Sequence, residues 1–180
     1  MRFVIDSDRA PTSTVGTTFE PPQAVDGWHR LSLVPDLQSA ENWCWAAIAA
    51  SVARHYGAAP ADQNEIAARL TGSVDREARL DAALRLTGCF GHWTPGKPLF
   101  DRVRFEINAG RPFAARIAWH QGAGHYVLVT GYHADGTLQI DDPATGQSVA
   151  PYAGFPERYR SGGGWTETFW TTPPNAGRRT

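Results

Sequence analysis

The hydrophobic pattern of the chain changes period near residue 110, and this change limits the folds that the chain can adopt. Between residues 38 and 110, apolar residues recur at three- and four-residue spacing between glycines, which predicts helices. From residue 113 onward, apolar residues alternate with others or form short β-rich runs, which predicts strands. Helices followed by antiparallel strands indicate an α+β fold.

A chain of 180 residues fits one domain with flexible ends. Residues 1–25 are rich in threonine, proline, aspartate and serine, and we expect them to form a flexible arm. Residues 26–172 are expected to form a single domain, with a helical part at 38–110 and a β part at 111–172. Residues 173–180 are expected to be a frayed tail.

Cap and turn residues place the individual elements. The predicted helices run from Asn42 to Gly57, from Asp62 to Gly72 and from Asp75 to Gly88, and a fourth contains residues 99–107. The predicted strands cover residues 28–34, 113–119, 125–132, 137–141 and 165–171. The run at 125–132 is apolar enough to be buried on both faces.

Charge and composition exclude several function classes. The chain has 17 basic and 18 acidic residues and shows no basic patch, so nothing indicates binding to nucleic acid or to an anionic membrane. No apolar run approaches the roughly 18 residues that a membrane-spanning helix needs. The N-terminus also lacks the apolar stretch of a secretory signal. We therefore expect a cytoplasmic protein, or one exported without a classical signal, for example as an injected effector.

Cys44 lies in the first turn of the first predicted helix. Asn42 is a good N-cap, because its side chain can accept hydrogen bonds from the free backbone N–H groups of that turn. The helix dipole and these N–H groups favour a thiolate over a thiol at this position. The apolar face of the helix is formed by Ile48, Val52 and Tyr56. The position of Cys44 thus indicates a reactive cysteine.

A buried cysteine most often packs as a small hydrophobic residue, so position alone does not assign Cys44 a role. Gln38 lies six positions earlier, in the loop that leads into the helix. Its side-chain amide can donate to the same oxygen as the Cys44 backbone N–H, and two such donors make an oxyanion hole. Cys89 is the other cysteine, and a reactive Cys44 leaves no disulfide within the chain, which fits a reducing compartment.

The segment 38–47, QSAENWCWAA, resembles the active-site segment of papain-like cysteine peptidases. Its tryptophan–cysteine–tryptophan–alanine run is most similar to the small bacterial branches, namely the bacteriocin-processing (double-glycine) peptidases and the avirulence-type papain-like effectors. The resemblance implies a two-lobe fold with the cysteine on a helical lobe and a histidine on a β lobe. It also implies a peptide or protein substrate. No CxxC or HExxH spacing is present, so neither a metal nor a cofactor is expected.

His125 is the favoured histidine among six. It opens a predicted strand downstream of Cys44, and the stretch 124–132, GHYVLVTGY, resembles the histidine strand of these peptidases. Gly124 has no side chain, which lets a substrate backbone approach closely, so we expect Gly124 to contact substrate. His120 is the second candidate, because it also falls near a strand end.

The third residue is an aspartate on the return strand. A two-residue hairpin loop at 135–136 would pair residues whose numbers add up to 271. Asp142 would then share a face with His125, but offset by roughly 13 Å along the ladder, so contact requires a bulge or bend near Gly131 or Pro143. A three-residue loop would place Asp141 on that face instead. The resemblance favours Asp142, because these peptidases carry their acid in an Asp-Pro segment.

These residues are compatible with three functions. In the first, Cys44 attacks a peptide carbonyl, His125 exchanges the proton, Asp142 orients the imidazole, and Gln38 stabilises the tetrahedral oxygen. In the second, an acyltransferase or transglutaminase-like enzyme passes the acyl group to an amine. The third is a non-catalytic binding module on the same fold, which would lack one of these residues, whereas all four are present.

Overall fold

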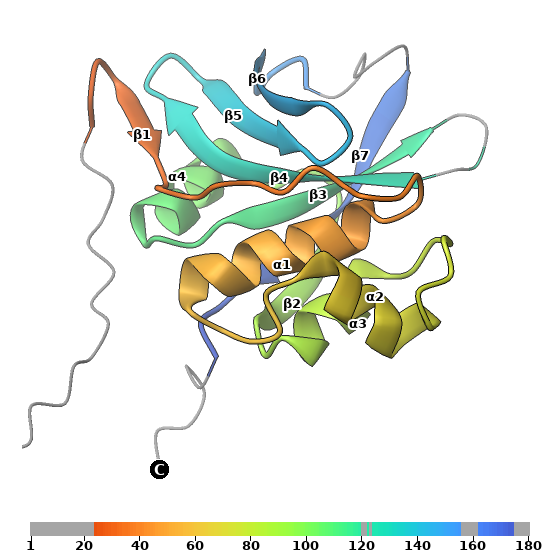
Figure 1. Cartoon of the computed structure of the whole chain (residues 1–180). Helices are drawn as coiled ribbons and strands as arrows, with labels where there is room; N and C mark the ends of the chain where they lie inside the picture. The colour runs from red at the N-terminus through yellow and green to blue at the C-terminus, as the bar shows by residue number, and fades with distance from the viewer. Residues whose placement is uncertain (1–23, 120–121, 123, 156–161, 175–180) are drawn as a thin grey trace, which may run out of the picture.

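Four helices and seven strands make up the computed structural model, which describes residues 24–119, 122, 124–155 and 162–174 (Figure 1). The helices are α1 (Cys44–Tyr56), α2 (Gln63–Thr71), α3 (Leu80–Leu86) and α4 (Phe100–Asn108). The strands are β1 (Trp28–Arg30), β2 (Phe90–Pro95), β3 (Phe113–Trp119), β4 (Gly124–His133), β5 (Thr137–Asp142), β6 (Gly146–Pro151) and β7 (Gly163–Thr171). The expected α+β class is confirmed.

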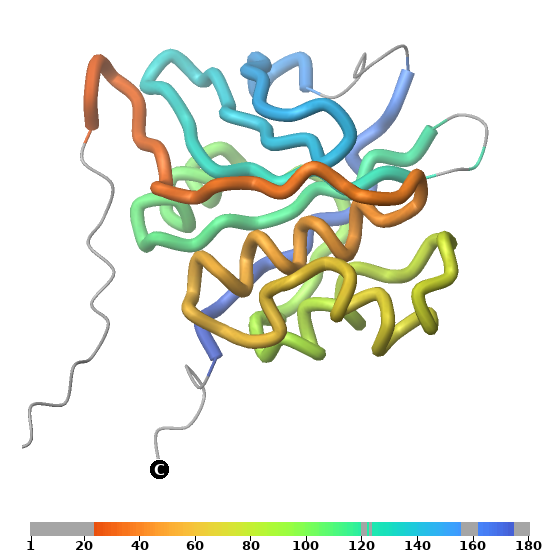
Figure 2. Tube along the Cα trace, in the orientation of Figure 1, coloured from red at the N-terminus to blue at the C-terminus, as the bar shows by residue number. Residues whose placement is uncertain are grey.

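The strands form one antiparallel sheet in the order β2-β7-β3-β4-β5-β6. β1 pairs with the end of β4 that lies beyond β3, between residues 131 and 133. The segment between β1 and α1 then crosses the sheet along β4 and leads into the cysteine helix (Figure 2). Its backbone is tied to the sheet where Leu31 donates to Thr130 and Gln38 donates to Pro143.

The sheet has a hydrophobic core on each face. On one face, α1, α2 and α3 pack against residues of β3, β4 and β7, and on the other α4 packs against residues of β3, β4 and β5 (Figure 1). β4 serves both cores, since Tyr126 and Leu128 face the three helices while Val127 and Val129 face α4. This two-sided burial, which the apolar run predicts, holds β4 rigidly against α1.

For α1 and α2, three of the four predicted caps are confirmed. Gly57 and Gly72 end α1 and α2 in the left-handed conformation, and the Asp62 side chain caps the start of α2. The prediction that Asn42 caps α1 is wrong by one residue: Trp43 is the cap, without a side-chain hydrogen bond. A tertiary contact explains this difference: the Asn42 backbone N–H donates to the Asp75 carboxylate at 2.9 Å.

Other predictions fail where pairing with a distant segment decides the structure. The helical part 38–110 contains the unpredicted edge strand β2, which pairs with β7 and leaves most of its side chains exposed. β6 is likewise unpredicted and mostly exposed. The third helix begins at Leu80, and the segment before it is not helical. Leu99 precedes α4 as its cap and is 79% exposed, so it is not part of the apolar face.

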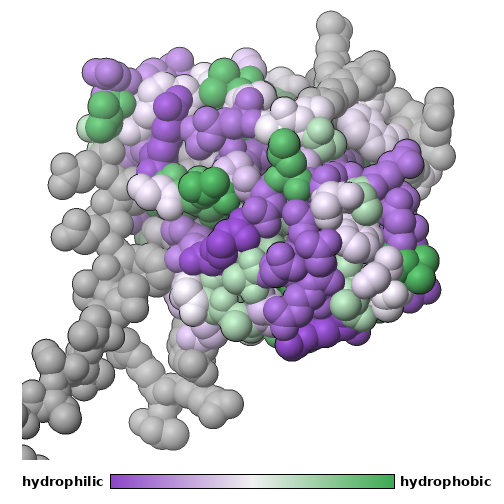
Figure 3. Space-filling view, in the orientation of Figure 1, coloured by the Kyte–Doolittle hydropathy of each residue, from purple (hydrophilic) through white to green (hydrophobic). Residues whose placement is uncertain are grey.

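The surface over α1 and α2 is mostly polar, with scattered hydrophobic side chains (Figure 3). Isolated exposed hydrophobic residues of this kind are normal for a folded protein. Among the described residues, no helix is long and apolar enough to cross a membrane. The two predicted ends, 1–25 and 173–180, fall almost entirely outside the described residues.

Candidate active site

Cys44 is the first residue of α1 and is buried at the start of the helix. The first N–H groups of a helix have no partner within the helix. In the part of the chain that the structure describes, the Cys44 N–H makes no backbone hydrogen bond, so it can donate to a bound group. Cys44 thus combines a thiol and a free donor at the positive end of the helix dipole.

The two tryptophans beside Cys44 anchor the segment that forms the opposite rim of the site. The Trp43 indole N–H donates to the carbonyl of Val74 at 3.3 Å, and the Trp45 indole N–H donates to the carbonyl of Arg76 at 3.2 Å. Both indoles are buried in the core beside the three helices. The tryptophan–cysteine–tryptophan run therefore fixes the cysteine helix and the rim segment 74–79 to one another.

His125 is the second residue of β4, and its side chain is 14% exposed. Its Nε2 lies 2.7 Å from Asp142 Oδ1, which leaves Nδ1 as the ring nitrogen for the Cys44 thiol. Burial lowers the pKa of His125, but hydrogen bonds to Asp142 and Cys44 outweigh this effect and raise the pKa to about 9. The imidazole is therefore protonated at neutral pH and can pair with a thiolate.

The hairpin brings Asp142 to His125 by a register that differs from the predicted one. Near the turn, Tyr132 pairs with Leu138, which rules out the two-residue loop. The register then shifts between Val129 and Gly131, which is at Gly131, the first of the two places that the sequence indicates for a bulge or bend. Beyond the shift Leu128 pairs with Asp141, so continued pairing would bring Asp142 opposite Val127 and halve the predicted offset from His125.

The neighbouring Asp141 lies in a different environment. It is 1% exposed, and it accepts hydrogen bonds from Thr130 Oγ1 at 2.5 Å and Gln147 Nε2 at 3.0 Å. Burial raises the pKa of Asp141. Side chains of adjacent strand residues point to opposite faces, so Asp141 points away from His125. His120, the second candidate histidine, lies outside the described residues.

Replacing Asp142 by asparagine should lower the pKa of His125 from about 9 towards its ordinary value of 6.5. The hydrogen bond and charge of Asp142 favour the protonated ring, so their loss makes the ring lose its proton at lower pH. Titration of the His125 ring protons by NMR measures the shift. The matched control is Asp141→Asn, which should leave the pKa of His125 unchanged. A shift in the control alone would contradict this arrangement.

Gln38 does not point its amide nitrogen into the cleft in this structure. The nitrogen donates to the backbone carbonyls of Ala40 at 2.9 Å and Glu41 at 2.5 Å. Its side-chain oxygen is buried and has no hydrogen-bond partner among the described residues. The Gln38 backbone N–H donates to Pro143 at 2.8 Å, so Gln38 also joins the cysteine loop to the turn after Asp142.

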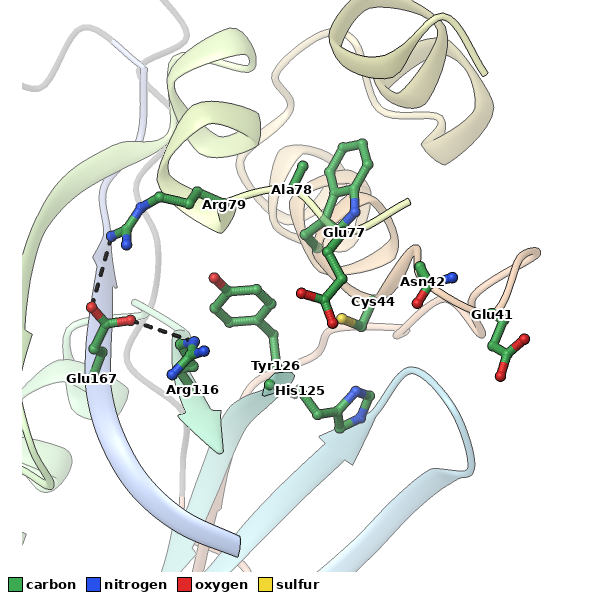
Figure 4. A pocket seen from close by; sticks show the side chains of 12 residues that line it. Glu41, Asn42, Cys44, Glu77, Ala78, Arg79, Arg116, His125, Tyr126 and Glu167 are labelled. Atoms are coloured by element: carbon green, nitrogen blue, oxygen red, sulfur yellow. Dashed lines mark ion pairs between the residues drawn. The ribbon is translucent and has the colours of Figure 1, made fainter. Parts of the chain in front are cut away.

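A cleft of about 570 Å³ opens beside Cys44 and His125 (Figure 4). Gly124, which the sequence predicts to contact substrate, lines this cleft, and a Cβ there would lie 2.6 Å from the end of the flexible Arg116 side chain, which can move aside. Lining residues that the sequence did not indicate include Glu77, Arg79, Arg116, Tyr126 and Glu167. They come from the rim segment, β3, β4 and β7, and no local motif links them.

The described residues contain no group of three or more histidine, cysteine or carboxylate side chains that could hold a metal ion. The chemistry considered for the site rests on Cys44, His125 and Asp142, which lie together beside the cleft. A thiolate next to a protonated imidazole can attack an electrophilic carbon and then protonate a leaving group. The helical side supplies the cysteine, and the sheet supplies the histidine and the aspartate.

The solved structures that are similar to this chain include two proteases. The first is a double glycine motif protease from an AMS/PCAT transporter in complex with the leader peptide, at 19% identity and a TM-score of 0.50, covering 79% of this chain and 94% of that chain. The second is the peptidase domain of Streptococcus ComA, a bi-functional ABC transporter, at 22% identity and a TM-score of 0.53, covering 77% of this chain and 96% of that chain. At identities this low, the structural similarity shows a shared fold alone.

No curated protein matches the sequence. A family model does match residues 27–159, and it describes the papain-like cysteine protease AvrRpt2. The matched range contains Gln38, Cys44, His125 and Asp142. It covers most of the chain, and the α+β structure agrees with the fold of the two solved peptidases. The chain therefore belongs to the family of the papain-like cysteine protease AvrRpt2 and is a cysteine peptidase.

Proposed function

We propose that this peptidase cleaves peptide bonds through a triad of Cys44, His125 and Asp142. The observation that carries the proposal is the continuous chain of contacts from the Asp142 carboxylate, at 2.7 Å from His125 Nε2, through the ring to the Cys44 thiol. Such a chain keeps the imidazole in one orientation and stabilises its protonated form. The leader peptide bound to one of the similar proteases supports a peptide as substrate here.

The reaction begins when the Cys44 thiolate attacks the carbonyl carbon of the scissile bond. The Cys44 backbone N–H donates to the oxygen that becomes negative, as in an oxyanion hole. His125 then gives its Nδ1 proton to the leaving amine, and the carbon–nitrogen bond breaks. Water attacks the resulting thioester, with His125 now accepting a proton, and the acid product leaves Cys44 free.

Gln38 is proposed as the second donor to the oxyanion. Its amide nitrogen is held by two loop carbonyls, so this role requires the side chain to exchange those bonds for the substrate oxygen. The buried, unpartnered side-chain oxygen makes the present position of the amide less favourable than a fully hydrogen-bonded one. Rotation of Gln38 on substrate binding would complete the pair of donors.

Labelling with a peptidyl epoxide, followed by mass spectrometry of the intact chain, tests the activated thiol. Cys44 should react rapidly at neutral pH, because the protonated His125 beside it favours the thiolate. Cys89 is the internal control, because it is fully buried and burial raises its pKa. His125→Ala should abolish the rapid reaction. Equal, slow labelling of both cysteines would overturn the proposal.

Cleavage in heavy-oxygen water separates hydrolysis from acyl transfer. If water is the acceptor, the new carboxylate of the product carries the heavy isotope. If an added amine is the acceptor, the product is an amide without it. We expect the labelled carboxylate even in the presence of a primary amine, and a product made solely as amide would instead assign the chain to acyl transfer.

A further inference from the structure

Two arginines and one glutamate stand together on a wall of the cleft next to His125. Arg79 ends the rim segment before α3, Arg116 lies in β3, and Glu167 lies in β7. One oxygen of Glu167 lies 3.8 Å from Arg79 Nη2, and the other lies 3.7 Å from Arg116 Nε (Figure 4). A single carboxylate thus separates two guanidinium groups that face the same cleft.

Most hydrogen-bond donors of these guanidinium groups are unused by the protein. Each group has five N–H donors. Arg79 uses Nε to bind Asp81 at 2.9 Å, and Arg116 uses Nη1 to bind Thr166 at 3.3 Å. The contacts with Glu167 are too long for hydrogen bonds. No further side-chain hydrogen bond of either arginine occurs among the described residues, so donors remain for a ligand.

The two arginines lie close to the reacting residues Cys44 and His125. The Arg116 guanidinium lies against Gly124, the residue before His125. Tyr126, the residue after His125, is buried and lines the same cleft, and its hydroxyl is hydrogen-bonded to the backbone of Leu80 next to Arg79. An extended peptide advances by roughly 3.3 Å per residue, so a peptide lying across Cys44 reaches this wall within a few residues.

The two arginines of the cleft lie at one end, whereas its carboxylates are spread along it (Figure 4). At the arginine wall, two guanidinium groups oppose the single Glu167 carboxylate, and Arg79 is also paired with Asp81 outside the cleft. The exposed carboxylate of Glu41 lies on the far side of Cys44, and Glu77 reaches the cleft from the rim (Figure 4). An anionic group is therefore favoured near the arginines and disfavoured towards Glu41.

We propose that Arg79 and Arg116 form a subsite for a carboxylate of the substrate peptide, with Glu167 holding the two guanidinium groups apart. Guanidinium donors match the geometry of a carboxylate and can bind it at two points. The carboxylate belongs either to an aspartate or glutamate side chain near the scissile bond or to the C-terminus of the peptide. This inference rests on the proposed function, since it names the substrate preference of the same site.

The test uses pairs of tripeptidyl epoxides that differ only in aspartate or asparagine at one position, built in both directions from the epoxide. A parallel pair carries a free or an amidated C-terminus. The rate of Cys44 labelling is measured for each member. In the wild-type chain, the acid member of one pair should react about tenfold faster than its amide counterpart or more, because a hydrogen bond to a charged group is worth that much. The pair that responds identifies the source of the carboxylate.

Three variants test whether Arg79, Arg116 and Glu167 cause the faster labelling by acid probes. Arg79→Gln and Arg116→Gln should each remove most of it, and Glu167→Gln should increase it by freeing both arginines. Arg104→Gln is the matched control: Arg104 is as exposed as Arg79 and is also paired with an aspartate, but lies in α4 away from the cleft. Added salt should weaken the wild-type preference.

Equal labelling by acid and amide probes at every position would overturn the subsite. So would a preference that survives both arginine substitutions. In either case, labelling of Cys44 by the amide probes that still depends on His125 would leave the proposed triad standing. Loss of that dependence on His125 would instead count against the triad, so the two failures are distinguishable. If the small reagent iodoacetamide labels Cys44 but no tripeptidyl probe does, a peptide-binding wall is also excluded.

Discussion

Replacing Cys44 by alanine should reduce kcat/KM towards a cleaved peptide by about 10⁴-fold or more, because the covalent route through a thioester disappears. The N–H at the helix start and the protonated His125 remain, but neither can form the bond to the substrate carbon. Cleavage assays with a peptide that the wild-type chain hydrolyses measure the loss. Folding should be preserved, since the substitution removes a single sulfur atom from a site that borders the cleft.

Cys89→Ala is the matched control for this prediction. Cys89 is also a buried free cysteine, but it packs beside α3 and contacts the backbone of Thr87 instead of His125. Its replacement should leave kcat/KM unchanged. A comparable loss in both variants would indicate that the cysteines act through stability, whereas full activity of Cys44→Ala would refute the thiol mechanism.

Replacing Trp45 by alanine should lower the free energy of unfolding by about 3 to 5 kcal/mol. Trp45 is 1% exposed and belongs to the core between α1 and the helices α2 and α3. Its loss leaves a cavity in that core, and it also removes the hydrogen bond from the indole to the carbonyl of Arg76. Denaturant unfolding followed by a spectroscopic signal measures the change.

Trp93→Ala supplies the comparison for Trp45. Trp93 lies on the edge strand β2 and is 46% exposed, so its replacement should cost about 1 kcal/mol or less. Trp45→Phe should fall between the two, because it keeps an aromatic ring in the core and loses the hydrogen bond that holds the rim. If Trp45→Ala cost no more than Trp93→Ala, the assigned role of this tryptophan in the core would be wrong.

The elements around the site could be predicted from the sequence because their signals are local. Cap residues and glycines act over one helical turn, which is why α1 and α2 end at Gly57 and Gly72 as expected. Apolar alternation acts over one strand, which is why β3 is found at the predicted residues. The same local reasoning selected Cys44 by its place at the start of a helix.

The tertiary structure decided the features that depend on pairing across the chain. β2 has no local signal and exists because β7 pairs with it. Contact between Asp142 and His125 depends on a register shift between Val129 and Gly131; the sequence indicated that a bulge or bend was needed, but it did not determine its position or the loop length. A bulge changes which residues oppose each other without changing the alternation pattern by which a strand is recognised.

The arginine wall of the cleft is the clearest example of a feature that the sequence alone does not reveal. Arg79, Arg116 and Glu167 are ordinary charged residues in three separate segments, and each alone would be read as solvent-exposed. They meet because β3 pairs with β7, which brings Arg116 opposite Glu167, and because the start of α3 packs against β7. By itself, the sequence determined the order of the elements and the reactive residue types; long-range packing determined the register, the cleft and its charge.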